Sequence, residues 1–407
     1  MNNKGTKSRS GKATSRGNSQ ATERPSSPKA RRSEAPSKKQ RSTRQRSKKQ
    51  LYTVSIYSGY AGKKSTIPTE LARAVLDLET LFTDETKITT QVWLLVQPGK
   101  KEHEGRPGAY AELNKDVRRA FFTQRDRLSR DELVVLLIDS TGGSAKAGYQ
   151  LAMFFRHFCG RFVALVPNVA KSAATLLAIG ADEIILGNSG ELGPVDAQVL
   201  EGIRYVPALD RVKALERLQA SALEAFDRTM ALLTLRSEQN IDELIPIAAD
   251  FAARLSEPYL QKQDMVEYTR MSRVLKIGED YASRLLYRQG KQESKVQNGY
   301  KGTQEDDQPY LQMAEGMVDA PDLEEERLSD YSDPSKRRAR ALAQHLVGAY
   351  PDHDFAIDMV EARRIGLQVR DPFSRMAPTI DKLYQVLTDP AYEGLTAMGR
   401  VEEAKVG

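Results

Sequence analysis

The sequence is poor in the residues that form disulfides and bind transition metals. Among its 407 residues there is one cysteine, Cys159, and there are four histidines. A single cysteine cannot form an intrachain disulfide, which fits a protein of a reducing compartment. No cysteine or histidine pair has the spacing of a zinc site, so we expect neither a metal nor another cofactor.

Long apolar runs are also missing. No stretch of about 18 apolar residues is present, so the sequence predicts no transmembrane segment. The first residues are polar and basic and lack the apolar core of a signal peptide, and we therefore expect a cytoplasmic protein. A phosphate-binding loop of the form G-x-x-x-x-G-K-[ST] is absent, so the chain itself is not expected to use ATP.

Charge is distributed unevenly along the chain. Residues 1–50 hold 16 Lys and Arg and 2 Glu, a balance of +14, whereas the remainder holds 45 basic and 53 acidic residues, a balance of −8. Ten serines and almost no apolar side chains accompany the basic residues, so this tail cannot bury enough surface to offset the entropy of ordering. We predict a disordered basic tail. It could contact nucleic acid, an anionic membrane surface or an acidic protein, or act only as a solubilising extension.

Strand and helix patterns alternate from residue 51 to 200. The patterns predict strands at 52–59, 91–99, 131–143, 161–167 and 182–187, and helices at 69–82, 114–128, 144–158 and 171–181. Such alternation is typical of an α/β fold with a parallel sheet and right-handed crossovers. The loops after successive strands then lie along one edge of the sheet, where ligands of open α/β sheets bind.

The pattern of residues changes after residue 200. Residues 201–287 have apolar residues at helical spacing and predict a helical region. Residues 288–340 form an acidic insertion, in which 305–333 hold 11 acids and one arginine. We expect this insertion to be mobile, either as a lid, as a partner for the basic tail or as a solvated loop. Residues 341–407 are expected to complete the α/β core.

One serine stands where the sheet edge is expected. Ser172 opens the predicted helix 171–181, and Gly142 and Gly143 follow the strand before it. Backbone N–H groups at a helix start are unpaired and favour negative charge. We therefore predict that Ser172 is a nucleophile and that the amides of the glycine pair and of Ala173 form an oxyanion hole. An ordinary helix-capping serine is the alternative.

Several motifs together resemble a known family. "IDSTGGSAKAG" and "VPNVAKSAATLLAIGADEIILGNSGELGPVDAQ" resemble the Clp/crotonase superfamily, and more narrowly the serine dehydrogenase proteinase family of Clp-fold serine peptidases. "HDFAIDMVEARRIGLQV" (353–369) is similar to the segment that closes the Clp fold. The resemblance is strong over 130–200 and 345–370 and weak over 50–130. It implies a Clp/crotonase-like parallel sheet with flanking helices and a homo-oligomer, either a trimer or a ring.

The general base departs from the family pattern. The Clp proteolytic subunit has a histidine in the turn where this chain has Asp196, and an aspartate in the region where this chain has His353. Triads are defined by geometry rather than chain order, so the two groups can have exchanged places. We predict Ser172, His353 and Asp196 as a catalytic triad. The alternative is that His353 has no catalytic role and only packs at a domain junction.

A serine–lysine dyad is a second possibility for the base. Lys171 precedes the serine, and Lys146 follows the glycine pair. A lysine base needs desolvation to lower its pKa.

The motifs favour an ATP-independent serine endopeptidase, a hydrolase that cleaves proteins or peptides. A crotonase-type acyl-CoA enzyme would use the same two amides without the serine. The third hypothesis is a catalytically inactive oligomeric scaffold of the same fold.

Overall fold

The structure is a computed structural model that describes residues 51–60, 63–97, 110–196, 198–201, 204–297 and 333–404. The predicted basic tail and most of the acidic insertion lie outside these residues. All described residues belong to one compact unit, Lys49–Gly407.

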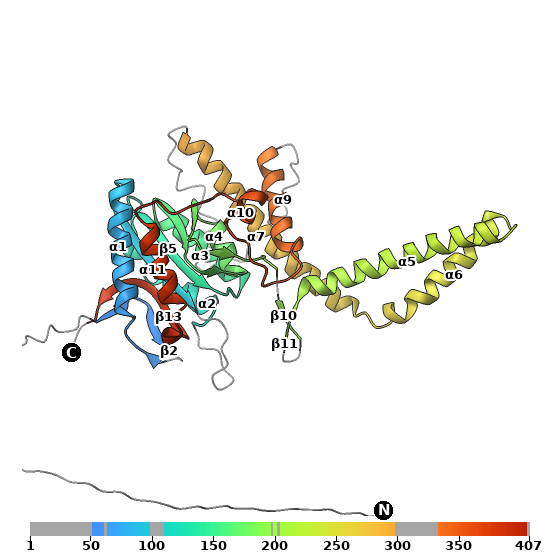
Figure 1. Cartoon of the computed structure of the whole chain (residues 1–407), viewed down its shortest axis with the longest axis horizontal. Coiled ribbons are helices and arrows are strands. Elements are labelled where there is room, and N and C mark those ends of the chain that lie inside the picture. Colours follow the sequence, from blue (N-terminus) through green and yellow to red (C-terminus); the bar gives the residue numbers. More distant parts are fainter. Residues whose placement is uncertain are drawn as a thin grey trace, which may run out of the picture. The chain divides into compact units, whose positions relative to one another are not determined.

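A central sheet of mostly parallel strands forms the core (Figure 1). Its strands run in the order β12-β8-β6-β5-β4-β13-β2-β3. The strands β4, β5, β6, β8 and β12 are mutually parallel, and β13 pairs antiparallel with β4 and β2. The bounds of the strands on this path are β2 Tyr57–Tyr60, β3 Lys63–Lys64, β4 Thr90–Gln97, β5 Leu133–Ser140, β6 Arg161–Val166, β8 Glu183–Leu186, β12 Val369–Arg370 and β13 Leu395–Glu403. The predicted α/β fold with a parallel sheet is thereby confirmed.

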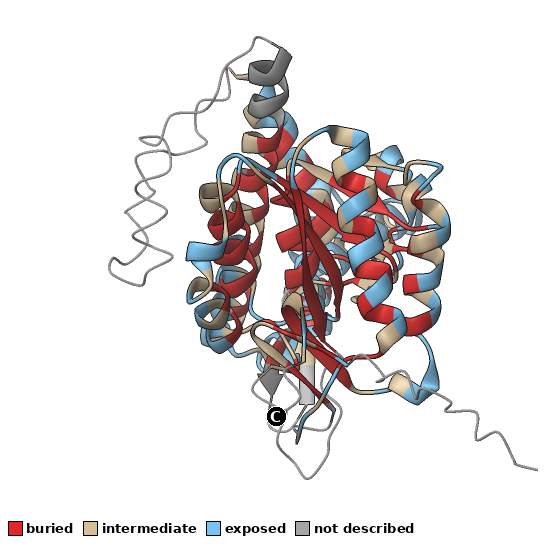
Figure 2. Ribbon diagram, turned by 90° about the vertical axis from the view of Figure 1, so that its left-hand side faces the viewer, coloured by how far each residue is buried: buried red, intermediate tan, exposed pale blue. Residues whose placement is uncertain are grey.

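Helices cover both faces of the sheet, as Figure 2 shows by the buried strands between them. Successive side chains of a strand point to opposite faces. Along β5, Leu136 packs into one apolar cluster and Leu137 into another. The first cluster includes residues of α3 (Ala145–Phe158) and α4 (Ala173–Ile179), and the second residues of α1 (Thr69–Thr86) and α11 (Ala377–Leu387). All eight residues of β5 are buried, as expected of a central parallel strand.

Helices also occupy the region after residue 207. The bounds are α5 Ala208–Arg236, α6 Ile241–Leu260, α7 Met265–Gln297 and α9 Pro334–Gly348. α5 pairs with α6 as a helical hairpin, and α7 packs along α9 (Figure 1). α7 extends ten residues beyond the helical region 201–287 that the sequence predicts.

Several elements differ from the sequence prediction. The predicted strand 52–59 is divided into β1 (Tyr52–Val54) and β2 (Tyr57–Tyr60). The predicted helix 114–128 is shorter: α2 is Lys115–Phe122, with Asn114 as its N-cap, and a 3-10 turn follows at Arg125–Arg127. The antiparallel strand β13 in the middle of the sheet was not predicted at all. Gly399 lets it pass close to the β1–β2 connection, because a Cβ there would lie 2.5 Å from Ser55 Oγ.

Short strands extend the sheet beyond the end of β5. β7 (Val169–Ala170) pairs in parallel with the end of β5 and with β9 (Glu191–Leu192). The remaining elements are β1 Tyr52–Val54, the antiparallel pair β10 Gln198–Glu201 and β11 Arg204–Pro207, the helix α10 Met359–Ile365 and the 3-10 turn Pro390–Tyr392. The β5–β7–β9 pairing gathers three loops that are distant in sequence, and these loops hold the candidate site.

Candidate functional site

The glycine pair lies directly against the candidate nucleophile. The N–H of Lys171 donates to the carbonyl of Ser140, 3.0 Å away, which joins β7 to the end of β5. A Cβ on Gly142 would lie 2.5 Å from the carbonyl oxygen of Lys171 and 3.0 Å from the Cβ of Ser172. Gly142 also has a φ of +99°, so this turn requires glycine for both space and conformation.

Ser172 has an unusual backbone for a residue with a side chain. Its φ is +51° and its ψ is −116°, at the position that precedes α4. Such strain persists only where surrounding contacts enforce it, and it is concentrated at functional sites. The side chain makes no capping hydrogen bond, although the residue stands at the N-cap position. The half-buried hydroxyl instead lies 3.5 Å from the carbonyl oxygen of Asp196.

Two backbone amides face no acceptor in the part of the chain that the structure describes. They are the N–H groups of Gly143 and Ala173, which the sequence predicts as an oxyanion hole. The N–H of Gly142 is already committed, because it donates to Ser140 Oγ over 3.1 Å. Only Gly143 and Ala173 therefore remain as donors for an oxyanion.

The glycine turn is fixed by residues that the sequence analysis did not identify. The N–H of Leu113 donates to the Gly142 carbonyl, and the N–H of Ser144 donates to the Leu113 carbonyl, both over 2.8 Å. Ser140 Oγ in turn donates to Gln97 Oε1 over 2.8 Å. These contacts join residues from separate strands and loops, so no local sequence signal reveals them.

His353 and Asp196 form a hydrogen-bonded pair. Nδ1 of His353 contacts Oδ1 of Asp196, whose residue is 5% exposed. This hydrogen bond raises the pKa of His353 above its ordinary value of 6.5, although burial acts in the opposite direction. With Nδ1 donating to the carboxylate, Nε2 is left as the basic nitrogen. Among the described residues, no hydrogen bond joins His353 to the Ser172 hydroxyl.

Lys171 binds the segment that carries His353. Its Nζ lies 2.6 Å from Glu191 Oε1, and the residue is only 8% exposed. Nζ also donates to the carbonyls of Leu192 and Phe355 over 3.3 Å and of Asp354 over 3.5 Å. An ammonium group with these acceptors is a structural clamp.

Neither candidate lysine base contacts the nucleophile. No hydrogen bond links Lys171 to Ser172 Oγ within the described chain, and Lys146 is exposed on α3. The lysine dyad therefore has no support in the geometry.

Backbone pairing holds the same segment, 353–357, which we call the strap. Leu192 and Ile357 exchange two N–H···O bonds of 2.9 and 3.0 Å. The rings of Tyr350 and Phe355 stack with centroids 4.7 Å apart. α10 begins directly after the strap, where Asp358 accepts the N–H of Glu361. The strap is thus paired with β9 at its last residue, Ile357, and leads directly into a capped helix.

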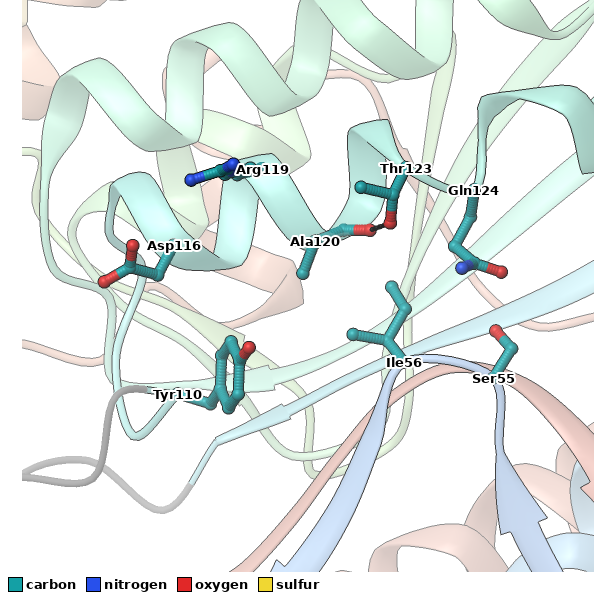
Figure 3. Close-up of a pocket in the computed structure, with 8 residues that line it drawn as sticks. All are labelled: Ser55, Ile56, Tyr110, Asp116, Arg119, Ala120, Thr123 and Gln124. Carbon is teal, nitrogen blue, oxygen red and sulfur yellow. Dashed lines mark hydrogen bonds between the residues drawn. The ribbon is translucent and has the colours of Figure 1, made fainter.

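A metal site would need several ligands close together among the described residues. They contain no group of three His, Cys, Asp or Glu that could hold a metal ion, and His103 lies outside them. No described helix is long and apolar enough to cross a membrane. A cavity of about 440 Å³ lies beside α2, where Tyr110 and Ile56 face the helix residues Asp116 and Arg119 (Figure 3). None of the candidate triad lines it.

Comparison with protein families supports the motif assignment. Residues 115–252 match the model of the family described as "ClpP-like SDH-type serine proteinase". The matched range contains the glycine pair, Ser172 and Asp196 and ends before His353. The family matched over residues 115–252 is the one that the motifs predict.

Two curated relatives share shorter segments with this chain. The uncharacterized protein MJ0137 of Methanocaldococcus jannaschii is 36% identical over 103 residues, which cover 25% of this chain and 34% of that protein. The uncharacterized protein MJ1495 of the same organism is 34% identical over 74 residues, which cover 18% and 25%. The chain thus spans about a third or less of the length of these relatives. No solved structure matches it significantly.

Proposed function

We propose that the protein is a serine endopeptidase that cleaves proteins or peptides through an acyl-enzyme on Ser172, without ATP. The observation that carries this proposal is the arrangement around the serine. The backbone of Ser172 is strained and its hydroxyl makes no capping hydrogen bond. The hydroxyl stands beside two backbone amides that have no acceptor among the described residues. The match to a serine proteinase family supports the same chemistry.

Each group has a defined task in this proposal. His353 Nε2 accepts the proton of Ser172 Oγ as the oxygen attacks the scissile carbonyl, and Asp196 stabilises the resulting imidazolium. The amides of Gly143 and Ala173 hold the oxyanion. His353 then protonates the leaving amine, and a water activated by the same imidazole hydrolyses the ester. Ser172 Oγ must turn from the Asp196 carbonyl toward Nε2 when substrate binds, since catalytic hydrogen bonds often tighten only in the complex.

Lys171 and Glu191 act as positioning residues in this proposal. They hold the strap against β9, and the strap places the imidazole beside Asp196. Misplacement by about 1 Å is enough to reduce catalysis strongly.

A fluorophosphonate probe tests the nucleophile directly. We expect wild-type protein to be labelled and Ser172→Ala to be unlabelled. Ser144→Ala is the matched control, because Ser144 lies on the same rim but accepts the N–H of Ala147 as the α3 cap. Cleavage of a labelled unfolded protein without ATP should follow the same pattern. Absence of labelling in folded wild-type protein would refute the proposal.

An inactive scaffold is the second candidate. The hydrogen bond from Ser172 to a backbone carbonyl, rather than to His353, is the observation that favours it. In that case the folded protein is neither labelled nor active. An acyl-CoA enzyme is distinguished by Ser172→Ala, which would leave its activity intact.

The setting of the protein is also proposed. The single cysteine favours a reducing compartment such as the cytoplasm. The family implies a homo-oligomer, and the basic tail supplies a contact for nucleic acid, an anionic membrane surface or an acidic protein.

A further inference from the structure

The α5–α6 hairpin exposes many large apolar side chains. On α6 the buried positions recur every four residues: Leu244, Ala248, Ala252 and Ser256. A second set with the same spacing lies beside them and is about half exposed: Ile247 (49%), Phe251 (52%), Leu255 (51%) and Tyr259 (59%). We call this second set the apolar stripe. The helix is therefore apolar over a wider face than α5 covers.

The apolar stripe continues into a groove between the two helices. A cavity of about 220 Å³ is lined by Leu218 and Ser221 of α5 and by Leu255, Ser256 and Tyr259 of α6. Apolar residues exposed singly are normal, but a continuous stripe beside a groove marks an interaction surface.

We propose that the apolar stripe is a self-association surface, on which α6 of one copy packs antiparallel against α6 of a second copy about a two-fold axis. A two-fold contact uses the same patch on both copies. The even spacing suits this, because antiparallel alignment places Phe251 opposite Leu255 of the partner subunit and Ile247 opposite Tyr259 of the partner subunit.

Charge favours the antiparallel direction. Asp250 and Arg254 flank the stripe, are exposed and form an ion pair of 2.7 Å within α6. Antiparallel pairing brings Asp250 toward Arg254 of the partner subunit, and the two-fold axis repeats this contact. Asp250 and Arg254 lie on the same side of the stripe, so parallel pairing would not bring them together across the contact.

The same charges argue against a membrane as the occupant. α6 carries four acids, Asp242, Glu243, Asp250 and Glu257, and one base, Arg254. Helices that lie on membrane surfaces have polar faces rich in lysine and arginine, because natural surfaces are anionic. A second copy of the chain therefore fits the stripe better than a lipid surface.

Sedimentation velocity of the full-length chain tests this proposal. We expect Phe251→Glu with Leu255→Glu to reduce the sedimenting species to half its wild-type mass, with self-association weakened at least about 30-fold. Val360→Glu is the matched control, since Val360 is 74% exposed on α10, away from the hairpin, and it should leave the mass unchanged. Circular dichroism must show equal helix content in all variants.

Exchanging the charges of Asp250 and Arg254 tests whether the two α6 helices pair antiparallel, and it leaves the residues of the apolar stripe unchanged. Asp250→Arg and Arg254→Asp should each weaken the association, and the double variant should restore it, because it preserves opposite charges both within and between copies. Failure of the double variant to restore association would overturn the antiparallel arrangement. A monomeric wild type, or a wild type that binds phosphatidylserine vesicles through the stripe without self-association, would overturn the proposal as a whole. Fluorophosphonate labelling is an independent readout of the Ser172 site and is expected to persist in every variant.

Discussion

At the scale of single residues, the pairing of His353 with Asp196 determines how the site responds to pH. A general base must be neutral, so activity falls as the pH drops through the pKa of the imidazole. The hydrogen bond to Asp196 raises the pKa of His353 above its ordinary value of 6.5, so the acid limb moves to higher pH than for an unpaired histidine. In Asp196→Asn the negative partner is lost, so the limb should move to lower pH and the rate should fall roughly 10³-fold or more.

The rate of fluorophosphonate labelling as a function of pH measures both effects. Asp352→Asn, which changes an exposed carboxylate of the same region, is the control and should shift the limb only slightly. An acid limb that stays in place in Asp196→Asn would show that His353 is not the group that titrates.

Asp139 is a second residue with a perturbed carboxyl, and here the consequence is for stability. It stands near the end of β5, where Asn168 Nδ2 donates to its Oδ1 over 2.9 Å. Burial raises the pKa of Asp139 to about 6, from 3.8. The folded state therefore holds the charged form at a cost that is full above the folded pKa and absent below the unfolded one. Asp139→Asn keeps the acceptor oxygen and removes the charge.

We expect Asp139→Asn to increase the free energy of unfolding at about pH 8, by at most about 3 kcal/mol for a pKa shift of about two units. The gain should shrink as the pH falls and vanish below about pH 4, where the wild-type carboxyl is protonated in both states. Urea unfolding of both proteins at several pH values measures this difference. An equal gain at every pH would mean that packing, not charge, is responsible.

At the scale of elements, the strap depends on Lys171. In Lys171→Met the ion pair with Glu191 and three carbonyl contacts are lost, while the volume is nearly conserved. The strap should open more often, so amide hydrogen exchange at 353–357 should accelerate and labelling of Ser172 should slow by about tenfold or more. Glu191→Gln should have a smaller effect, because the carbonyls still hold the ammonium group.

Lys146→Met is the control for a lysine base, and we expect neither exchange nor labelling to change in it. Lys171→Met that abolishes labelling at every pH, without faster exchange in the strap, would contradict the positioning role and assign the base to Lys171 itself.

Some strands could be predicted from the sequence and others could not. β5 and β6 could be predicted because their apolar runs are buried on both faces of the sheet. β13 could not, since its sequence, LTAMGRVEE, combines an interior glycine with a charged end, and its place between β4 and β2 depends on pairings with distant residues. The two-residue strands β7 and β9 are likewise defined only by their partners.

The candidate site also has features that the sequence predicts and features that it does not. Ser172, the glycine pair and the His353–Asp196 pair were found from motifs and from the edge rule for parallel sheets, and the structure brings them together. The direction of the Ser172 hydroxyl and the clamp formed by Lys171 could not be predicted. Both depend on contacts with loops that lie 20 to 184 residues away in sequence, Glu191 and Phe355 among them.

At the scale of the whole molecule, parallel strands explain why such distant segments meet. The carboxyl ends of β5, β6 and β8 lie along one edge. The strap is brought to that edge by the pairing of Ile357 with Leu192 of β9, and α10 then leads into β12, which joins β8 in parallel. A residue near position 350 can therefore complete a site that begins near position 140.

At this scale, the excess positive charge of the chain is concentrated in residues 1–48. Residues 1–48 hold 15 Lys and Arg and 2 Glu, and the compact unit begins at Lys49. Deleting 1–48 therefore removes a balance of +13 without removing any buried residue of the described core. We expect the truncated protein to keep its urea midpoint and its fluorophosphonate labelling. It should elute from a heparin column at much lower salt, since binding to a polyanion follows the number of cationic contacts.

The two readouts separate the tail from the fold. Replacing the tail with an uncharged Gly-Ser segment of equal length is the matched control, and it should reproduce the weak heparin binding. Equal retention of the full and truncated chains would place the polyanion contact on the folded part, whose net charge is negative. A lower urea midpoint in the truncated chain would instead mean that the tail contributes to the stability of the folded unit.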